Sequence, residues 1–248
     1  MQLCINPTYE HLREWICSLP TIFPTSGTVI YDARNQIRVI EHKGIPFNVK
    51  RFHCPALPNR LIYSTLRPPK AVRAYHNAER LHTLGIATPE AVAYILMGNG
   101  LIQESYLVTL QVPYTRNFYE FRYHDVAGYE DIIRAFARFT ANMHIHGVVH
   151  KDYSPGNILF DKKEDGDISI CIVDINRMDF GKKPVGMETA CKNLCRLWGR
   201  RDFIHALSEE YAAARGWNAQ QVEQRLTYYW EHFWHFKSDA DIERIFSR

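Results

Sequence analysis

The hydrophobic pattern divides the chain into a strand-rich first part and a helix-rich remainder. Three short segments, 28–31, 37–40 and 47–52, are rich in β-branched and aromatic residues. Turn signals separate them, at Ala33-Arg34-Asn35 and at His42-Lys43-Gly44. Because the connections are so short, the three segments are predicted to form antiparallel strands.

Helical spacing of apolar residues appears on either side of these strands. One predicted helix covers residues 3–19 and is expected to stop at Pro20. Another follows Pro68-Pro69, running from about residue 70 to residue 84, where Gly85 ends it.

Two further strands and a short helix are expected next. Strands are predicted at 92–97 and 101–110, joined at Asn99-Gly100, a strong hairpin signal. The aromatic and polar segment 114–123 is predicted to be a short helix.

The strongest helical pattern covers residues 129–146. Its apolar stripe is Ile132, Ile133, Phe136, Phe139 and Met143. A two-stranded hairpin is then predicted from 158–160 and 168–173, and residues 189–248 have a helical pattern. Together these elements predict an α+β protein.

Composition narrows the class of protein. The chain has 248 residues, of which 46% are hydrophobic, which is enough for one large domain or two small lobes. No apolar run approaches the roughly 18 residues of a membrane span, and residues 1–21 lack the apolar centre of a signal peptide. A cytoplasmic protein is therefore expected. The net charge of only +3 argues against a nucleic-acid partner.

The six cysteines are scattered and contain no C-x-x-C pair, so we expect reduced thiols. Cys191 and Cys195 have helical spacing, but no neighbouring Cys or His pair completes a zinc site.

The candidate chemistry lies between the long helix and the hairpin. His150-Lys151-Asp152 has the H-x-D pattern, Asn157 follows in D-x-x-x-x-N-I-L, and Asp174 ends an apolar strand. This order resembles the catalytic core of kinase-fold phosphotransferases. Each residue alone is common in turns, but the combination is specific. Asp152 would take the acceptor's hydroxyl proton, and the oxygens of Asn157 and Asp174 would bind Mg²⁺.

From about Gly27 onward the chain most resembles the lipopolysaccharide core kinases, which phosphorylate Kdo or heptose. The resemblance rests on Asn48-Val49-Lys50-Arg51-Phe52, on Leu84-Gly85-Ile86-Ala87-Thr88-Pro89 and on the segment from His150 to Leu159. It implies a two-lobed protein-kinase-like fold with a small antiparallel β N-lobe and a mainly helical C-lobe. It also implies ATP, Mg²⁺ and transfer to a sugar hydroxyl. The expected divisions are a helical extension at 1–26, an N-lobe at 27–110 and a C-lobe at 111–248.

Nucleotide contacts follow from the same resemblance. Lys50, on the third strand, would hold the phosphates, and Glu79, the only acid of the following helix, would pair with it. His76 marks an alternative register one turn earlier. The phosphate-covering turn contains Arg34 and Asn35 but lacks the expected glycines, and Arg34 is predicted to compensate.

Other functions stay open at this point. A regulated protein kinase is disfavoured because Ser154 replaces the usual Lys and A-P-E is absent. A small-molecule kinase of the same fold and a pseudokinase that serves only as a binding module are alternatives.

A basic segment, 55–73, contains no acidic residue and carries Arg60, Arg67, Lys70 and Arg73. With the neighbouring Arg51 and His53, it is predicted to face a phosphorylated glycolipid or the anionic inner membrane.

Overall fold

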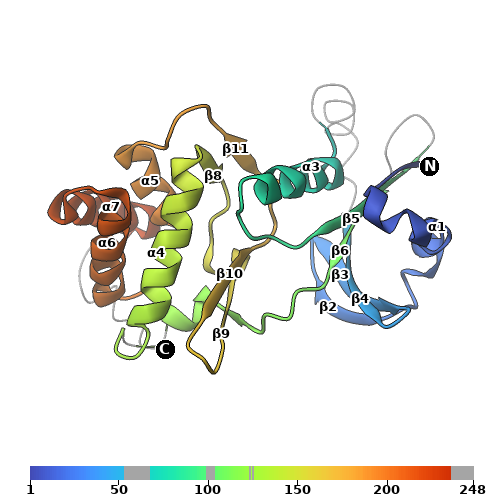
Figure 1. The fold of residues 1–248 in the computed structure, drawn as a ribbon, viewed down its shortest axis with the longest axis horizontal. Coiled ribbons are helices and arrows are strands. Elements are labelled where there is room, and N and C mark those ends of the chain that lie inside the picture. Colours follow the sequence, from blue (N-terminus) through green and yellow to red (C-terminus); the bar gives the residue numbers. More distant parts are fainter. Residues whose placement is uncertain (53–67, 99–103, 123, 125, 236–248) are drawn as a thin grey trace. The chain divides into compact units, whose positions relative to one another are not determined.

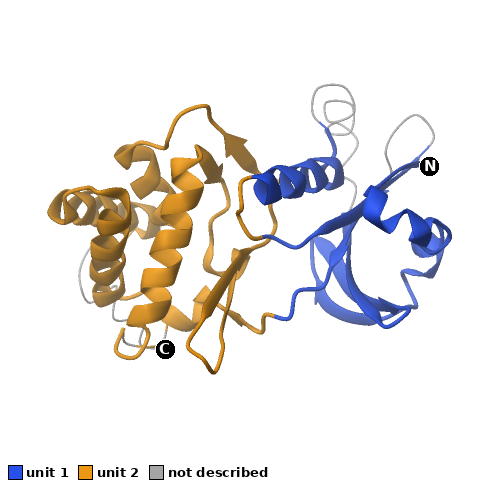
Figure 2. Ribbon diagram, in the orientation of Figure 1, with its two compact units in different colours: residues 1–83, 88–113 blue, residues 84–87, 114–248 orange. Residues whose placement is uncertain are grey.

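The computed structural model describes residues 1–52, 68–98, 104–122, 124 and 126–235 (Figure 1). The chain forms two compact units, coloured separately in Figure 2. Unit 1 contains residues 1–83 and 88–113, and unit 2 contains residues 84–87 and 114–248.

Unit 1 is built on a six-stranded antiparallel sheet in the order β1-β5-β6-β4-β3-β2. Its strands are β1 (Gln2–Ile5), β2 (Thr28–Asp32), β3 (Asn35–His42), β4 (Ile45–Phe52), β5 (Ala91–Met97) and β6 (Glu104–Leu110). The strands predicted at 28–31, 37–40, 47–52 and 92–97 are therefore confirmed. The predicted hairpin at Asn99-Gly100 lies outside the described residues.

The turn between β3 and β4 follows from its sequence. Lys43 and Gly44 connect the paired residues His42 and Ile45 and have φ angles of 52° and 77°. Positive φ at both central residues is the requirement of a tight type I′ turn, and glycine adopts this conformation without strain.

The helix expected over residues 3–19 is wrong at both ends. Residues 2–5 instead form β1 and pair with β5, so tertiary pairing overrides the local helical spacing. The segment continues as a 3-10 helix, Pro7–Leu12, and then as α1, Arg13–Ile22, which passes through Pro20. The last turn persists because Leu19 and Phe23 are fully buried, and the Phe23 amide bonds the Leu19 carbonyl at 2.8 Å.

Two helices cover opposite faces of this sheet. Ile16 and Leu19 of α1 belong to the same buried cluster as Ala93 and Ile95 of β5. The intervening residue Tyr94 instead contacts Tyr75 of α3 (Lys70–Thr83), with ring centroids 5.4 Å apart. Because successive strand residues point to opposite faces, α1 and α3 must lie on different sides.

Unit 2 is mainly helical. Its helices are α4 (Glu130–Ile145), α5 (Met187–Leu194), α6 (Arg201–Arg215) and α7 (Ala219–Trp234). The long predicted helix over 129–146 is confirmed as α4, and the helical character of 189–248 is confirmed over its described residues. An aromatic cluster packs between α4, α6 and the small strands: Phe118, Phe121, Phe136, Phe160 and Phe203.

Two small sheets complete unit 2. One has the order β10-β9-β7, from Ile168–Ile172, Ile158–Lys162 and Arg116–Asn117. The other pairs β11 (Met178–Phe180) with β8 (Val148–His150). The predicted hairpin is therefore confirmed. The helix expected over 114–123 is only partly formed, as a 3-10 helix at Phe118–Arg122, because β7 pairs with β9 just before it.

The cysteines are free thiols wherever the structure describes them. Five of the six, Cys4, Cys17, Cys171, Cys191 and Cys195, carry no disulfide, and Cys54 lies outside the described residues. Burial raises the pKa of the Cys191 thiol to about 12, so this thiol stays protonated at neutral pH. Within the described residues, no helix is both long and apolar enough to cross a bilayer.

Candidate active site

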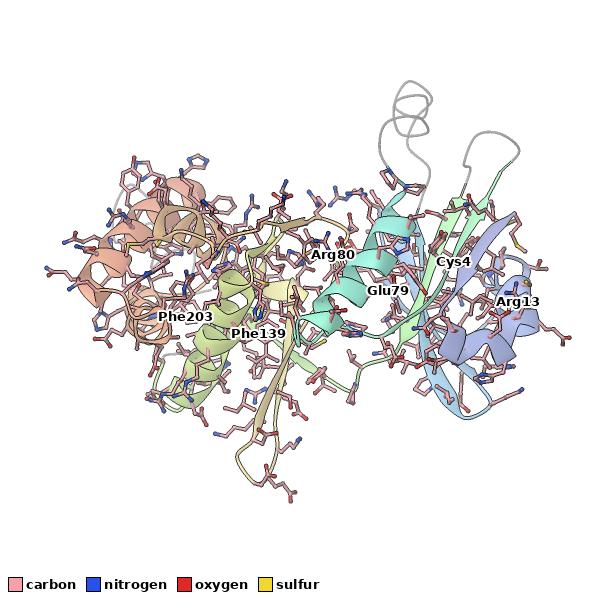
Figure 3. All side chains as sticks on the ribbon, turned by 45° about the horizontal axis from the view of Figure 1, so that its top comes forward. Cys4, Arg13, Glu79, Arg80, Phe139 and Phe203 are labelled. Carbon is pink, nitrogen blue, oxygen red and sulfur yellow. The ribbon has the colours of Figure 1, made fainter. Side chains whose placement is uncertain are left out.

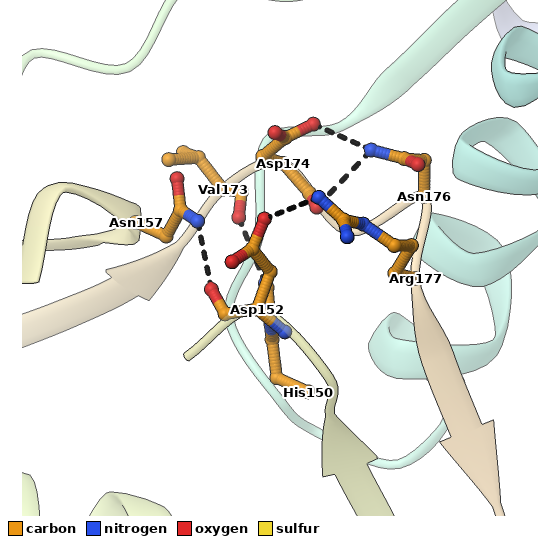
Figure 4. A network of polar contacts seen from close by, with 7 residues as sticks. All are labelled: His150, Asp152, Asn157, Val173, Asp174, Asn176 and Arg177. Carbon is orange, nitrogen blue, oxygen red and sulfur yellow. Dashed lines mark hydrogen bonds and ion pairs between the residues drawn. The ribbon is translucent and has the colours of Figure 1, made fainter. Parts of the chain in front are cut away.

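The sequence motif between α4 and β11 folds into one polar network within unit 2 (Figure 4). β8 ends at His150, a 3-10 turn covers Pro155–Asn157, and β9 starts at Ile158. Across the hairpin Ile158 pairs with Ile172, and the Val173 amide bonds the Asn157 carbonyl at 2.9 Å. This register brings Asn157 and Asp174 to the same end of the hairpin.

His150 joins the two halves of the network. Its side chain is fully buried, and its Nδ1 accepts a 3.1 Å hydrogen bond from the Asp152 amide. The proton therefore lies on Nε2, which donates to the Val173 carbonyl at 3.0 Å. Burial lowers the His150 pKa, so the ring is neutral at pH 7. A neutral ring of this tautomer fixes the Asp152 loop to the segment just after β10 that carries Asp174.

Asn157 is oriented by a bond to the Asp152 backbone. Its Nδ2 donates to the Asp152 carbonyl at 2.8 Å. Since the amide nitrogen is used there, the side-chain oxygen points the other way, as Figure 4 shows. That orientation suits an oxygen ligand for a hard cation.

Asp174 occupies an unusual backbone conformation, with a φ angle of 55°. Aspartate tolerates this left-handed region better than most residues do. Its carboxylate accepts a 2.6 Å hydrogen bond from Nδ2 of Asn176. Asn176 thus fixes the rotamer of the candidate metal ligand.

Asp152 pairs with an arginine that the sequence reading missed. Arg177 Nη2 lies 2.6 Å from Asp152 Oδ2, with the two side chains 50% and 29% exposed. Arg177 directly follows Asp174-Ile175-Asn176, and its position next to the candidate metal ligand was the one local signal. A surface arginine has no characteristic spacing, so only the structure reveals its partner.

A second, buried network of hydrogen bonds holds the backbone at His150, where the Asp152 loop begins. Asn193 Nδ2 donates to the His150 carbonyl at 2.8 Å, and its Oδ1 accepts from His144 Nε2 at 3.1 Å. The Tyr211 hydroxyl donates to His144 Nδ1 at 2.7 Å and accepts from Arg215. Burial lowers the pKa of His144 to about 4, so this histidine is neutral. No signal in the sequence pointed to Asn193.

The predicted nucleotide residues belong to unit 1. Lys50 lies in β4 with its Nζ 5.1 Å from the centroid of the Phe52 ring. Glu79, labelled on α3 in Figure 3, pairs with His76 at 2.9 Å. The two alternative candidates for the helix position therefore contact each other, and the pairing of Glu79 with Lys50 remains a prediction.

The other two predicted residues are Arg34, in the turn between β2 and β3, and Asn35, the first residue of β3. The Ala33 amide bonds the Asn35 carbonyl at 3.1 Å, which closes the turn around Arg34. The side-chain oxygen of Asn35 is buried and has no hydrogen-bond partner within the described structure. Contact of Arg34 and Asn35 with phosphates remains a prediction.

The donor set around Asn157 and Asp174 fits Mg²⁺. An amide oxygen and a carboxylate are hard ligands, and Mg²⁺ usually takes few protein ligands and shares the rest with phosphates and water. Within the described residues there is no cluster of three or more His, Cys, Asp or Glu side chains that could hold a metal ion.

Comparisons with known proteins bear on the fold and the family. A solved structure of WaaP in complex with acyl carrier protein has a TM-score of 0.64 and 18% identity, covering 98% of this chain and 99% of that one. The PknI kinase domain of Mycobacterium tuberculosis has a TM-score of 0.42 and 13% identity, covering 78% and 74%. Among the curated proteins, none matches.

The fold is therefore that of the protein-kinase-like class, as the resemblance implied. Residues 47–229 match the lipopolysaccharide kinase (Kdo/WaaP) family. Since this match covers well over half of the chain, the protein belongs to that family.

Proposed function

We propose that this protein transfers the γ-phosphoryl group of ATP to a hydroxyl of Kdo or heptose in the lipopolysaccharide core. The single observation that supports this most is the network that joins Asp152, Asn157 and Asp174 through His150 and Val173. Family membership implies a kinase that uses ATP. We further propose that the acceptor sugar is Kdo or heptose, that the metal is Mg²⁺, and that the residues of the network have the roles described next.

In this proposal each residue of the network has one task. Asp152 binds the acceptor hydroxyl and accepts its proton. Asn157 and Asp174 hold Mg²⁺, which when bound neutralises charge on the phosphate oxygens. His150 and Asn176 keep these groups oriented. Lys50, supported by Glu79, and the turn with Arg34 and Asn35 hold the nucleotide phosphates.

The test is a transfer assay with labelled ATP and a panel of acceptors. The panel contains Kdo- and heptose-bearing glycolipids, free sugars and a generic protein substrate. Label in a core glycolipid that depends on Asp152 supports the proposal. Label in protein or in an unrelated small molecule would instead support another kinase of this fold.

A pseudokinase is the second candidate, and the glycine-free turn at Ala33–Asn35 favours it. A pseudokinase would bind ligands without transferring phosphate. Binding of ATP and glycolipid with no label transferred, under conditions where a known kinase is active, would establish this alternative.

The location of the reaction also belongs to the proposal. We place it in the cytoplasm, with peripheral contact to the inner membrane through the basic segment 55–73. Lys70 and Arg73 lie at the start of α3, whereas Arg60, Arg67 and His53 lie outside the described residues. Because Debye screening acts within about 8 Å at physiological salt, this contact must weaken as salt increases. Vesicle binding by the wild type and by the variant with Arg60, Arg67, Lys70 and Arg73 changed to Gln tests it.

A further inference from the structure

Arg177 pairs with Asp152 but leaves part of its guanidinium exposed to solvent. Its guanidinium binds the carboxylate of Asp152 through Nη2, at 2.6 Å, yet its side chain is 50% exposed. A guanidinium carries five N–H donors in a planar fork, so binding one carboxylate oxygen leaves donors for another anion. A phosphate or a carboxylate is the group that such a fork matches best.

The negative charge around Asp152 makes a neighbouring cation important for binding an acidic acceptor. Asp152 and Asp174 are both carboxylates, and the phosphates of a bound nucleotide add more negative charge. An acceptor with its own acidic group would be repelled here unless a cation lay next to the base. Lys151, the nearest residue in sequence, is already paired with Asp179 at 2.7 Å. Arg177 is the cation that the structure places directly on Asp152.

We infer that Arg177 is an acceptor-binding residue, and that the acceptor is a sugar bearing an acidic group near the hydroxyl to be phosphorylated. Arg177 holds Asp152 with one nitrogen and binds the acid group of the sugar with the others. The acid group is either the carboxylate of a sugar acid or a phosphate already attached to the sugar. The inference rests on the proposed function, since it takes Asp152 to face the acceptor hydroxyl.

The competing explanation is that Arg177 only positions Asp152 or stabilises the transferred phosphoryl group. Both roles affect every acceptor equally, whatever the charge of the sugar. A contact with the acid group affects only acceptors that carry it. The comparison of charged and neutral acceptors therefore separates the two explanations.

The experiment measures the dissociation constants of two matched acceptor pairs by calorimetry, with wild type and Arg177→Gln. One pair is the methyl glycoside of Kdo and its neutral carboxamide. The other is a heptose methyl glycoside with and without a phosphate. Kcat and KM for transfer to the same four compounds are measured separately.

In the wild type, the charged member of one pair should bind more tightly than its neutral partner. Arg177→Gln should weaken that charged member by about 10- to 100-fold, the usual effect of losing a hydrogen bond to a charged group, and change the neutral one by less than about 3-fold. Loss confined to the carboxylate pair identifies a sugar acid, and loss confined to the phosphate pair identifies a phosphorylated sugar. The same loss should appear in KM.

Arg134→Gln is the matched control. Arg134 of α4 pairs with Glu210 of α6 at 2.9 Å, and the side chains are 48% and 27% exposed, almost the same as for Arg177 and Asp152. This variant should leave all four constants unchanged.

Equal losses for charged and neutral members would overturn the inference, as would a lower kcat with unchanged binding. A wild type that binds both members of each pair equally would also overturn it, independently of how the variant folds. Tight, Arg177-dependent binding of a charged acceptor without transfer leaves the inference standing and rejects the proposed kinase function.

Discussion

The side-chain amide of Asn157 donates a 2.8 Å hydrogen bond to the backbone carbonyl of Asp152. The proposed metal ligand and the proposed base are thus parts of one small loop. Because the nitrogen is already used, the bond sets the oxygen as the end of the amide that would face a metal. Substitutions here should therefore separate metal binding from proton transfer only when they leave this bond intact.

Asp174→Ala should remove the stabilisation that Mg²⁺ and ATP give to the wild type. At a ligand concentration of 100 times Kd, ligand binding contributes about 2.7 kcal/mol to the free energy of unfolding. For a chain of this length that corresponds to an increase in Tm of roughly 5 to 10 °C. Thermal unfolding with and without Mg²⁺ and ATP measures the gain. Asp179→Ala, which breaks a surface ion pair with Lys151, is the control and should keep it.

Asp152→Asn should leave nucleotide binding intact and lower the rate of transfer by about 10² to 10⁴, because the amide cannot accept the hydroxyl proton. The measurement is steady-state transfer to the acceptor found in the panel. A variant that keeps nearly full activity would show that another group is the base.

The proposed pairing of Lys50 with Glu79 predicts that substitutions of the two residues are not additive. Lys50→Met and Glu79→Gln should each lower kcat/KM, and the double variant should lose less than the sum of the two. His76→Gln is the informative control, because His76 binds Glu79 at 2.9 Å. A silent Glu79→Gln together with a damaging His76→Gln would assign the lysine's partner position to His76.

The buried His144 predicts a specific pH dependence of stability. Its pKa is lowered by burial from 6.5 to about 4, so between these values the unfolded chain binds a proton that the folded chain does not. Its contribution is therefore complete above about pH 6.5 and is lost as the pH falls towards 4. From pH 7 to pH 5 the free energy of unfolding should fall by about 2 kcal/mol on account of this group.

Urea unfolding of the wild type and of His144→Gln at the two pH values measures this contribution. His144→Gln should be less stable than the wild type at pH 7. Its free energy of unfolding should fall by less between pH 7 and pH 5. An equal decrease in both proteins would contradict the assignment. In His205→Gln the free energy of unfolding should fall by more than in the wild type between pH 7 and pH 5. The reason is that hydrogen bonding to Glu223 raises the pKa of His205, so this histidine stabilises the folded wild type at the lower pH.

Gly147→Ala should destabilise the protein much more than Gly85→Ala. Both glycines have positive φ, of 72° and 67°, so both substitutions incur the left-handed penalty of about 1 to 2 kcal/mol. At Gly147 an added Cβ would also lie 2.7 Å from the carbonyl oxygens of Gly181 and Lys183, whereas at Gly85 it meets nothing within 4 Å. We expect a total loss of about 3 kcal/mol at Gly147. Losses of the same size at both positions would show that small shifts of the backbone near Gly181 and Lys183 remove the clash at Gly147 with little loss of stability.

The sequence predicted the local elements well where local signals decide. Short runs rich in β-branched and aromatic residues, with turn signals between them, predicted β2, β3 and β4. The apolar stripe of α4 predicted the long helix. It failed at residues 2–5, which are a strand only because β5 lies beside them. It failed again at Pro20, where the burial of Leu19 and Phe23 keeps the helix going.

The candidate site shows the same division between local and distant information. Asp152, Asn157 and Asp174 follow from a contiguous motif, and the hairpin register brings two of them to one end. Arg177 and Asn193 were missed because their roles depend on partners 25 and 43 residues away in the chain. The predicted partner of Lys50 also lies on another element, α3. A one-turn shift along that helix exchanges Glu79 for His76, so sequence spacing could not choose between them.

The short strand β1 covers one edge of the sheet in unit 1. It occupies the edge of the sheet beside β5, an almost wholly buried apolar strand, Ala91–Met97. If Gln2–Ile5 were removed or pulled away, the backbone donors and acceptors of β5 would form an open, hydrophobic edge, which is the feature that recruits strands from other molecules. These four residues thus keep the edge at β5 from pairing with a strand of another molecule.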